Sequence, residues 1–133
     1  MQLARLAKSY QSVAVTTATP GQLVLMLFDG ALRFLSTALH GFQKDGIAER
    51  NEQIHNNLIK SQNILRELQA SLDLHQGGEF AKTMYALYDF MLEQLQKANL
   101  AKDSEPISTV ERLLGDIRNS WAQMLQQSQT SAA

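Results

Sequence analysis

The segment Glu52-Gln53-Ile54-His55 is where the chain places metal-ligating side chains at a spacing that metalloproteins use. Di-metal centres in helical bundles combine two Glu-x-x-His pairs with further carboxylates that point inward from the other helices. The chain contains no second such pair, and Glu52 and His55 flank the apolar residue Ile54 rather than replace it in the helical stripe. We therefore interpret the motif as part of a solvated helix face and expect no metal site.

Residue types that could support hydrolysis are present, but their arrangement does not indicate catalysis. His40, His55 and His75 fall near predicted helix ends or polar faces, and no serine stands in a nucleophile elbow. The pair Gly77-Gly78 lacks the lysine and the strand-loop-helix context of a phosphate loop, so we interpret it as a turn. The absence of cysteine excludes thiol catalysis, thiolate metal sites and disulfides. We expect neither an enzyme nor a bound cofactor.

Composition limits the class of partner. The 133 residues are 44% hydrophobic and 19% charged, with a formal net charge of −1, which fits one compact domain. Basic and acidic residues are interspersed, so neither nucleic acid nor an anionic membrane is an expected partner. The longest apolar run is too short to span a bilayer, and no signal peptide is apparent at the N-terminus. The expected location is the cytoplasm.

The segment 19–35 has the strongest local signals in the chain. Thr19 and Gln22 form a potential capping box, and Pro20 occupies the first helical position. Six apolar residues follow without interruption at 23–28, and on a helix they point all the way round the axis. A single core accepts about half of such a ring, so this helix has more apolar surface than one packing seam requires.

Periodicity predicts four helices, at about 20–42, 47–72, 79–98 and 105–126. The stripes of the second and fourth helices recur at alternating intervals of three and four, the spacing of left-handed bundle packing. The second helix has the stripe Ile54, Leu58, Ser61, Leu65, Leu68 and Leu72, and the fourth has Ile107, Val110, Leu114, Ile117, Trp121 and Met124. The stripe of the third helix is Phe80, Met84, Leu87, Met91, Leu95 and Ala98. Short turns favour an all-α, antiparallel, up-down-up-down four-helix bundle over 19–126. Residues 1–18 are expected to form a short N-terminal cap segment, and 127–133 a disordered tail. Asp29 can pair with Arg33 on the surface; alternatively Asp29 and Asp89 face solvent or form a hydrogen bond between helices. Asn99 can take the left-handed position at the end of the third helix.

The surplus apolar surface of the first and third helices permits two interpretations. It could simply be core, as methionine and aromatic stripes usually are. Alternatively, it could form a groove for a partner helix, with the N-terminal segment lying over the groove when no partner is bound.

Several stretches together resemble one known family. They are Tyr10 and 17–35, then 68–73 followed by 77–79, then 87–91 and 98–99, and finally 113–121. In this order they resemble the FliS family of flagellar secretion chaperones over nearly the whole chain. Thr19 stands where the family commonly has serine, and Phe28 and Phe90 where it commonly has tyrosine.

The resemblance implies an antiparallel four-helix bundle that works in the cytosol. It further implies a chaperone that binds the disordered C-terminal segment of flagellin, prevents premature polymerisation, and aids delivery to the export gate, where the membrane component FlhA is a docking partner. On this basis, the expected client-binding or groove-supporting residues are Leu23, Leu27, Phe28, Leu58, Leu65, Met84 and Tyr88. The expected movable cap and export-gate contacts are Leu6 and Tyr10, and the expected polar rim is Asp29, Arg33 and Asp89.

A second function remains open at this point. A helical adaptor that self-associates through the same apolar surface, with no export client, would have the same pattern. The chaperone interpretation predicts a monomer or weak homodimer when free, whereas the adaptor predicts a stable oligomer.

Overall fold

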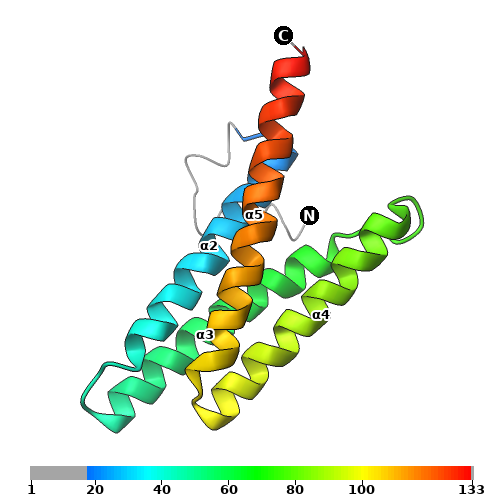
Figure 1. Ribbon diagram of the computed structural model, residues 1–133. Coiled ribbons are helices and arrows are strands. Elements are labelled where there is room, and N and C mark those ends of the chain that lie inside the picture. The colour runs from blue at the N-terminus through cyan, green and yellow to red at the C-terminus, as the bar shows by residue number, and fades with distance from the viewer. Residues whose placement is uncertain (1–17, 133) are drawn as a thin grey trace.

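The computed structural model describes residues 18–132, with side chains described as far as residue 128. Four helices make up this part of the chain: α2 (Pro20–Gly41), α3 (Ile47–Ala70), α4 (Gly78–Ala101) and α5 (Ser104–Ala132). The chain reverses its direction at each of the three turns between them (Figure 1). The prediction of an all-helical bundle is therefore confirmed. The predictions for residues 1–17, including Leu6 and Tyr10, lie outside the described residues.

The start of α2 forms as the sequence predicts. The Thr19 hydroxyl accepts a hydrogen bond from the Gln22 backbone N–H at 3.2 Å, and the Gln22 side chain accepts one from the Thr19 N–H at 3.0 Å. Pro20 then occupies the first turn, where its missing N–H leaves no carbonyl without a partner. This reciprocal cap fixes the point at which the chain enters the bundle.

The end of α4 differs from the prediction. Lys102, rather than Asn99, adopts the left-handed conformation, with φ 51°. Asn99 remains helical, and its side-chain Nδ2 lies 2.9 Å from Nδ1 of His55 on α3. The Lys102 ammonium group donates to the Asn99 backbone carbonyl at 2.8 Å, which satisfies a carbonyl near the helix end. The prediction placed the cap one turn too early because Asn99 is instead used for a contact between helices.

The last helix is longer than predicted. α5 continues to Ala132, so the expected disordered tail at 127–133 is helical as far as residue 132. The segment after Gly115 contains neither glycine nor proline, and glutamine and alanine are favourable helix formers. The prediction relied on the lack of apolar anchors after Gln126, but the helix continues on local propensity without them.

Each helix packs against two others. α2 contacts α3 and α5, and α4 likewise contacts α3 and α5. Between them lies one buried cluster to which every helix contributes, with Leu35, Ile54, Met91 and Leu114 among its fully enclosed members. The hydroxyl of the buried Ser61 donates to the Ala31 carbonyl at 3.3 Å, so the polar group in this α2–α3 seam has a partner.

α2 is the most apolar helix of the bundle. Its 22 residues include an 18-residue window with mean hydropathy 1.4, so by length and composition alone it could cross a membrane. The length of the uninterrupted apolar run, six residues, predicts no spanning segment, but the average over a longer window is also apolar. Leu27, Phe28, Ala31 and Leu35 of this helix are enclosed by the bundle, as in the core helix of a soluble protein.

Candidate partner-binding groove

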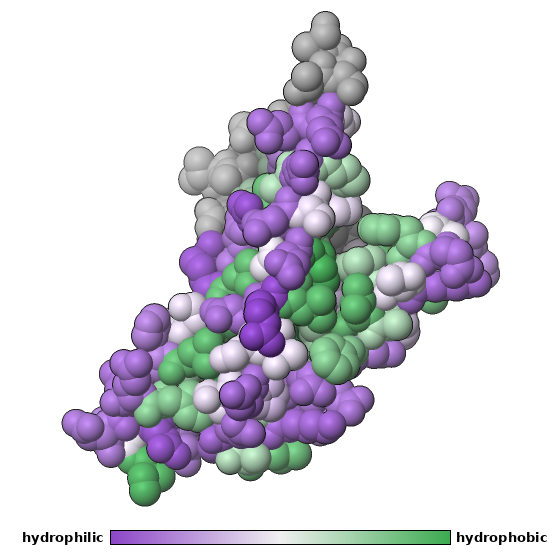
Figure 2. Space-filling model, viewed as in Figure 1, coloured by the Kyte–Doolittle hydropathy of each residue, from purple (hydrophilic) through white to green (hydrophobic). Residues whose placement is uncertain are grey.

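A groove of about 700 Å³ opens where the start of α4 and the C-terminal half of α5 diverge. Figure 2 shows hydrophobic surface in this hollow, between α5 and α4. All four helices contribute to the lining, which is mainly apolar and aromatic. The principal apolar lining residues are Leu23, Val24, Phe28, Leu68, Leu72, Phe80, Met84, Tyr88, Ile117, Trp121 and Met124. A concave apolar site of this size can accommodate a cluster of side chains from a bound peptide, or a short helix.

The inner wall of the groove is held by contacts between α2 and α5. Trp121 meets Phe28 edge to face, with ring centroids 6.2 Å apart and planes at 81°. The Trp121 indole Nε1 also donates to the Gly21 carbonyl at 2.9 Å. Gly21 lets α5 approach closely, because a Cβ there would lie 2.6 Å from Cδ2 of Leu125. These contacts fix the wall before any partner binds.

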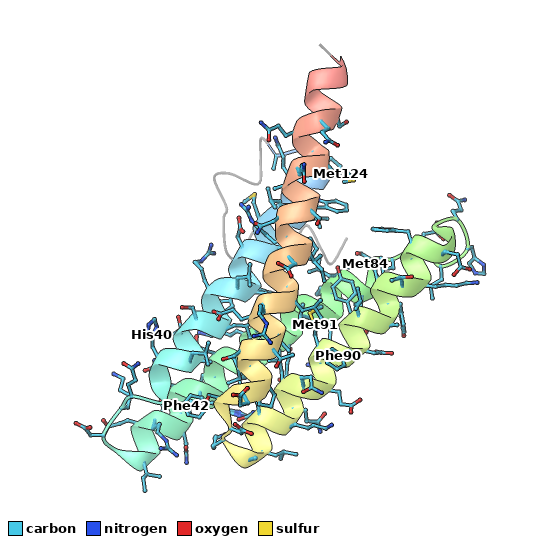
Figure 3. All side chains as sticks on the ribbon, viewed as in Figure 1. His40, Phe42, Met84, Phe90, Met91 and Met124 are labelled. Carbon is cyan, nitrogen blue, oxygen red and sulfur yellow. The ribbon has the colours of Figure 1, made fainter. Side chains whose placement is uncertain are left out.

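The outer edge exposes large apolar side chains. Phe80 of α4 is 61% exposed and Met124 of α5 is 46% exposed, although both line the groove. Figure 3 shows Met84 and Met124 on the facing sides of α4 and α5, whereas His40 and Phe42 lie near the distant α2–α3 turn. Burying Phe80 and Met124 under a partner would remove further apolar surface from water, which favours binding.

A glycine permits the tight turn that begins this edge. At Gly77 a Cβ would lie 2.5 Å from Cβ of Ala81 and 2.6 Å from the carbonyl oxygen of Asp73. The Gly77 N–H donates to that same carbonyl at 2.8 Å. Asp73 tightens the turn further, because its Oδ1 accepts from the backbone N–H groups of His75 and Gln76, both at 3.0 Å.

Among the residues that the structure describes, charge at the groove has a single sign. Asp73 and Asp116 are the charged residues among its lining, and both are exposed. Neither forms an ion pair with the described residues. Ser71 and Ser120 supply the other polar side chains of the lining, apart from Tyr88. Within the described part of the chain, no three acidic or histidine side chains gather as metal ligands would.

Tyr88 is the buried polar residue of the lining. Its side chain is 3% exposed, and burial raises the pKa of its phenol well above the ordinary value. The phenol is therefore a neutral hydrogen-bond donor at physiological pH.

Comparison with known proteins identifies the family of this chain. The family model described as flagellar protein FliS matches residues 3–128, which is nearly the entire chain. The chain belongs to the FliS family.

Curated FliS relatives support this assignment. Flagellar secretion chaperone FliS of Bacillus subtilis is 39% identical over 118 residues, which cover 89% of this chain and 84% of the relative. The Salmonella typhimurium protein of the same name is 38% identical over 122 residues, covering 88% and 87%. Its Escherichia coli counterpart is 36% identical over 114 residues, covering 84% and 80%.

In this FliS chain, the predicted client-binding residues fall into two groups. Leu23, Phe28, Met84 and Tyr88 line the groove. The other three, Leu27, Leu58 and Leu65, are enclosed in the core and do not line it. Their role at the groove is therefore limited to supporting it from below. Stripe periodicity identifies inward-facing positions, but it does not show at which level the helices diverge.

The three predicted rim residues of this FliS chain lie outside the groove lining. Asp29 pairs with Arg118 of α5 rather than with Arg33, so the Asp29–Arg33 pair is wrong and the alternative, a hydrogen bond between helices, is present. Arg33 is exposed. Asp89 accepts a 2.7 Å hydrogen bond from Nε2 of Gln69 and so belongs to the α3–α4 seam.

The sequence reasoning missed several residues that line the groove. Phe80, Ile117, Trp121 and Met124 all appear in the predicted stripes of the third and fourth helices but were not assigned to the site. A signal was available for Trp121, because it stands in the apolar stripe of the fourth helix, and short connections place the fourth helix of an up-down bundle beside the first.

Proposed function

We propose that this protein is an export chaperone that binds the disordered C-terminal segment of flagellin in the groove between α2, α4 and α5. Two observations support the proposal. The curated relatives are named flagellar secretion chaperones, and the groove combines a preformed apolar floor with exposed Phe80 and Met124 at its edge. Binding would hold flagellin unpolymerised until export. The proposal assigns the protein a binding role and no catalysis.

The energetics of a disordered client suit such a groove. Ordering a disordered segment costs about 2–5 kcal/mol of the gross interaction free energy. A site can offset that cost when it buries several large apolar side chains at once, and when its own wall needs no rearrangement. The Trp121–Phe28 and Trp121–Gly21 contacts supply a wall of this kind. Release requires no nucleotide if a further partner takes over the client.

The N-terminal segment is proposed as a displaceable cap. Pro20, the first residue of α2, itself lines the groove, so α2 begins at the edge of the site. Leu6 and Tyr10 are the apolar residues of this segment proposed to cover the groove and, once displaced, to contact the export-gate component FlhA. The proposed location is the cytosol, where flagellin is made.

Calorimetric titration with the C-terminal segment of flagellin from the same organism tests this function. The proposal predicts saturation at one to one, a negative heat-capacity change and a gain of helical signal, because apolar surface is buried as the client orders. Absence of heat and of co-elution would contradict it. If the free protein instead elutes as a stable oligomer whose size the segment does not change, the self-associating adaptor is favoured.

A further inference from the structure

Tyr88 combines burial with an unused hydroxyl group. Its ring is almost wholly enclosed and lines the groove. The hydroxyl forms no hydrogen bond with any residue whose side chain the structure describes. Buried tyrosine hydroxyls in proteins usually have a partner, so a hydroxyl without one calls for an explanation.

The Tyr88 hydroxyl differs from the polar atoms that the structure encloses without a partner. In the described part of the chain, the sealed polar side-chain atoms that lack a partner are Nε of Arg50 and Oδ1 of Asn51, both near the start of α3. The Tyr88 hydroxyl is not among them. Tyr88 borders the groove, so a partner seated there is placed to reach its hydroxyl.

The surroundings restrict what this donor can bind. Among the described residues, the groove lining is mainly apolar, and its charged members are the carboxylates Asp73 and Asp116. An anionic acceptor would be repelled by both carboxylates and would lose its hydration in an apolar site. A neutral carbonyl or amide oxygen has neither disadvantage. Such an oxygen also occurs in every peptide segment.

We propose that the Tyr88 hydroxyl donates a hydrogen bond to a neutral oxygen, a backbone carbonyl or a side-chain amide, of the client segment in the groove. The inference rests on the proposed function, because it assumes that a client segment occupies this site. The hydroxyl then fixes the register of the segment, while Phe80 and Met124 bury its apolar side chains. A segment whose oxygen in that register is a carboxylate is selected against.

The substitution Tyr88→Phe tests the inference, because it removes the hydroxyl and keeps the ring. We expect affinity for the flagellin segment to fall by about three- to ten-fold, the usual effect of one net hydrogen bond. Tyr85→Phe is the matched control, since Tyr85 lies on the same helix, is 39% exposed and does not line the groove. The control should bind as the wild type does. Unchanged or tighter binding by Tyr88→Phe, with a melting temperature equal to wild type, overturns the inference.

A second measurement needs no substitution at Tyr88. The chain has three tyrosines, so ¹³Cζ-tyrosine labelling gives three resonances, two of which are assigned with Tyr10→Phe and Tyr85→Phe. We expect the remaining resonance, from Tyr88, to shift when the segment binds, as its hydroxyl gains an acceptor. A Tyr88 resonance that stays in place while the segment saturates the protein overturns the hydrogen bond but leaves the proposed function intact. Failure of the wild-type protein to bind the segment at all overturns the proposed function first.

Discussion

Asp29 of α2 and Arg118 of α5 form an ion pair across the bundle, with 2.7 Å between Oδ1 and Nε, although 89 positions separate them in the chain. The hydrogen bond to Asp29 raises the pKa of the Arg118 guanidinium above its ordinary value. Both side chains remain about one-third exposed. The pair joins the same two helices that Trp121 connects, so it supports the wall of the groove.

A double-mutant cycle should measure the strength of this pair. With Asp29→Ala and Arg118→Ala, we expect a coupling free energy of about 0.2–1 kcal/mol, decreasing at high salt because the pair is partly exposed. The same cycle with Arg33→Ala in place of Arg118→Ala should give almost none. Urea denaturation at low and high salt provides the measurement. A larger coupling to Arg33 would restore the surface pair that the sequence suggested.

The incorrect Asp29–Arg33 pair shows that spacing within one helix is not enough to predict the partner of a charged side chain. Spacing along one helix indicates which side chains can meet, but Asp29 has a partner on another helix, and no periodicity reveals that competition. Local signals performed better: the Thr19–Gln22 capping box is present, and the predicted starts of all four helices lie within one residue of those observed. Local chemistry determines these features, so one sequence is sufficient to predict them.

The residues that line the groove could not be predicted from the sequence alone. Leu58 and Met84 have the same inward-facing pattern, yet Leu58 is enclosed while Met84 lines the groove. The difference arises from the level at which α4 and α5 diverge. Contacts between residues far apart in the sequence, such as Gly21 against Leu125, bring α5 close to α2 at this level. The family resemblance correctly indicated the FliS family, but not which residues face outward.

Two glycine substitutions should have opposite effects on stability. Gly77→Ala should lower the free energy of unfolding by about 1–3 kcal/mol, because the new methyl group meets Ala81 and the Asp73 carbonyl below contact distance. Gly115→Ala should raise it by about 0.5–1 kcal/mol, since a methyl group added at this helical position of α5 would meet no atom within 4 Å. Chemical denaturation measures the free energy of unfolding of both variants. A Gly77→Ala variant as stable as wild type would contradict the tight turn.

Burial of Tyr88 predicts a loss of stability in alkali. The unfolded chain releases the phenol proton from about pH 10, whereas the raised pKa keeps it bound in the folded protein. The free energy of unfolding should therefore fall as pH rises above 10, by up to about 1.4 kcal/mol per pH unit from this group. The measurement is the urea midpoint of wild type and of Tyr88→Phe between pH 9 and 11, plotted against pH to give a slope for each protein. Equal slopes for the two proteins would show that the phenol is not buried as described.

Removing residues 1–15 should test the proposed cap. The bundle over 19–126 has its own core, so we expect the helical signal and the cooperativity of melting to stay nearly unchanged. Affinity for the flagellin segment should be equal or higher, because no cap competes for the groove. Circular dichroism and titration of the truncated protein provide the two measurements. Loss of cooperative melting would instead assign the segment to the core.

The most direct test of the central claim compares two phenylalanines of α4 by calorimetric titration with the flagellin C-terminal segment. Phe80 is 61% exposed and lines the groove, whereas Phe90 is 43% exposed and does not. Phe80→Ala should weaken binding by about ten-fold or more, because a large apolar contact is lost, with little change in stability. Phe90→Ala should bind as the wild type does. Equal affinities for the two variants, or a loss confined to Phe90→Ala, would contradict the assignment of the groove as the client site.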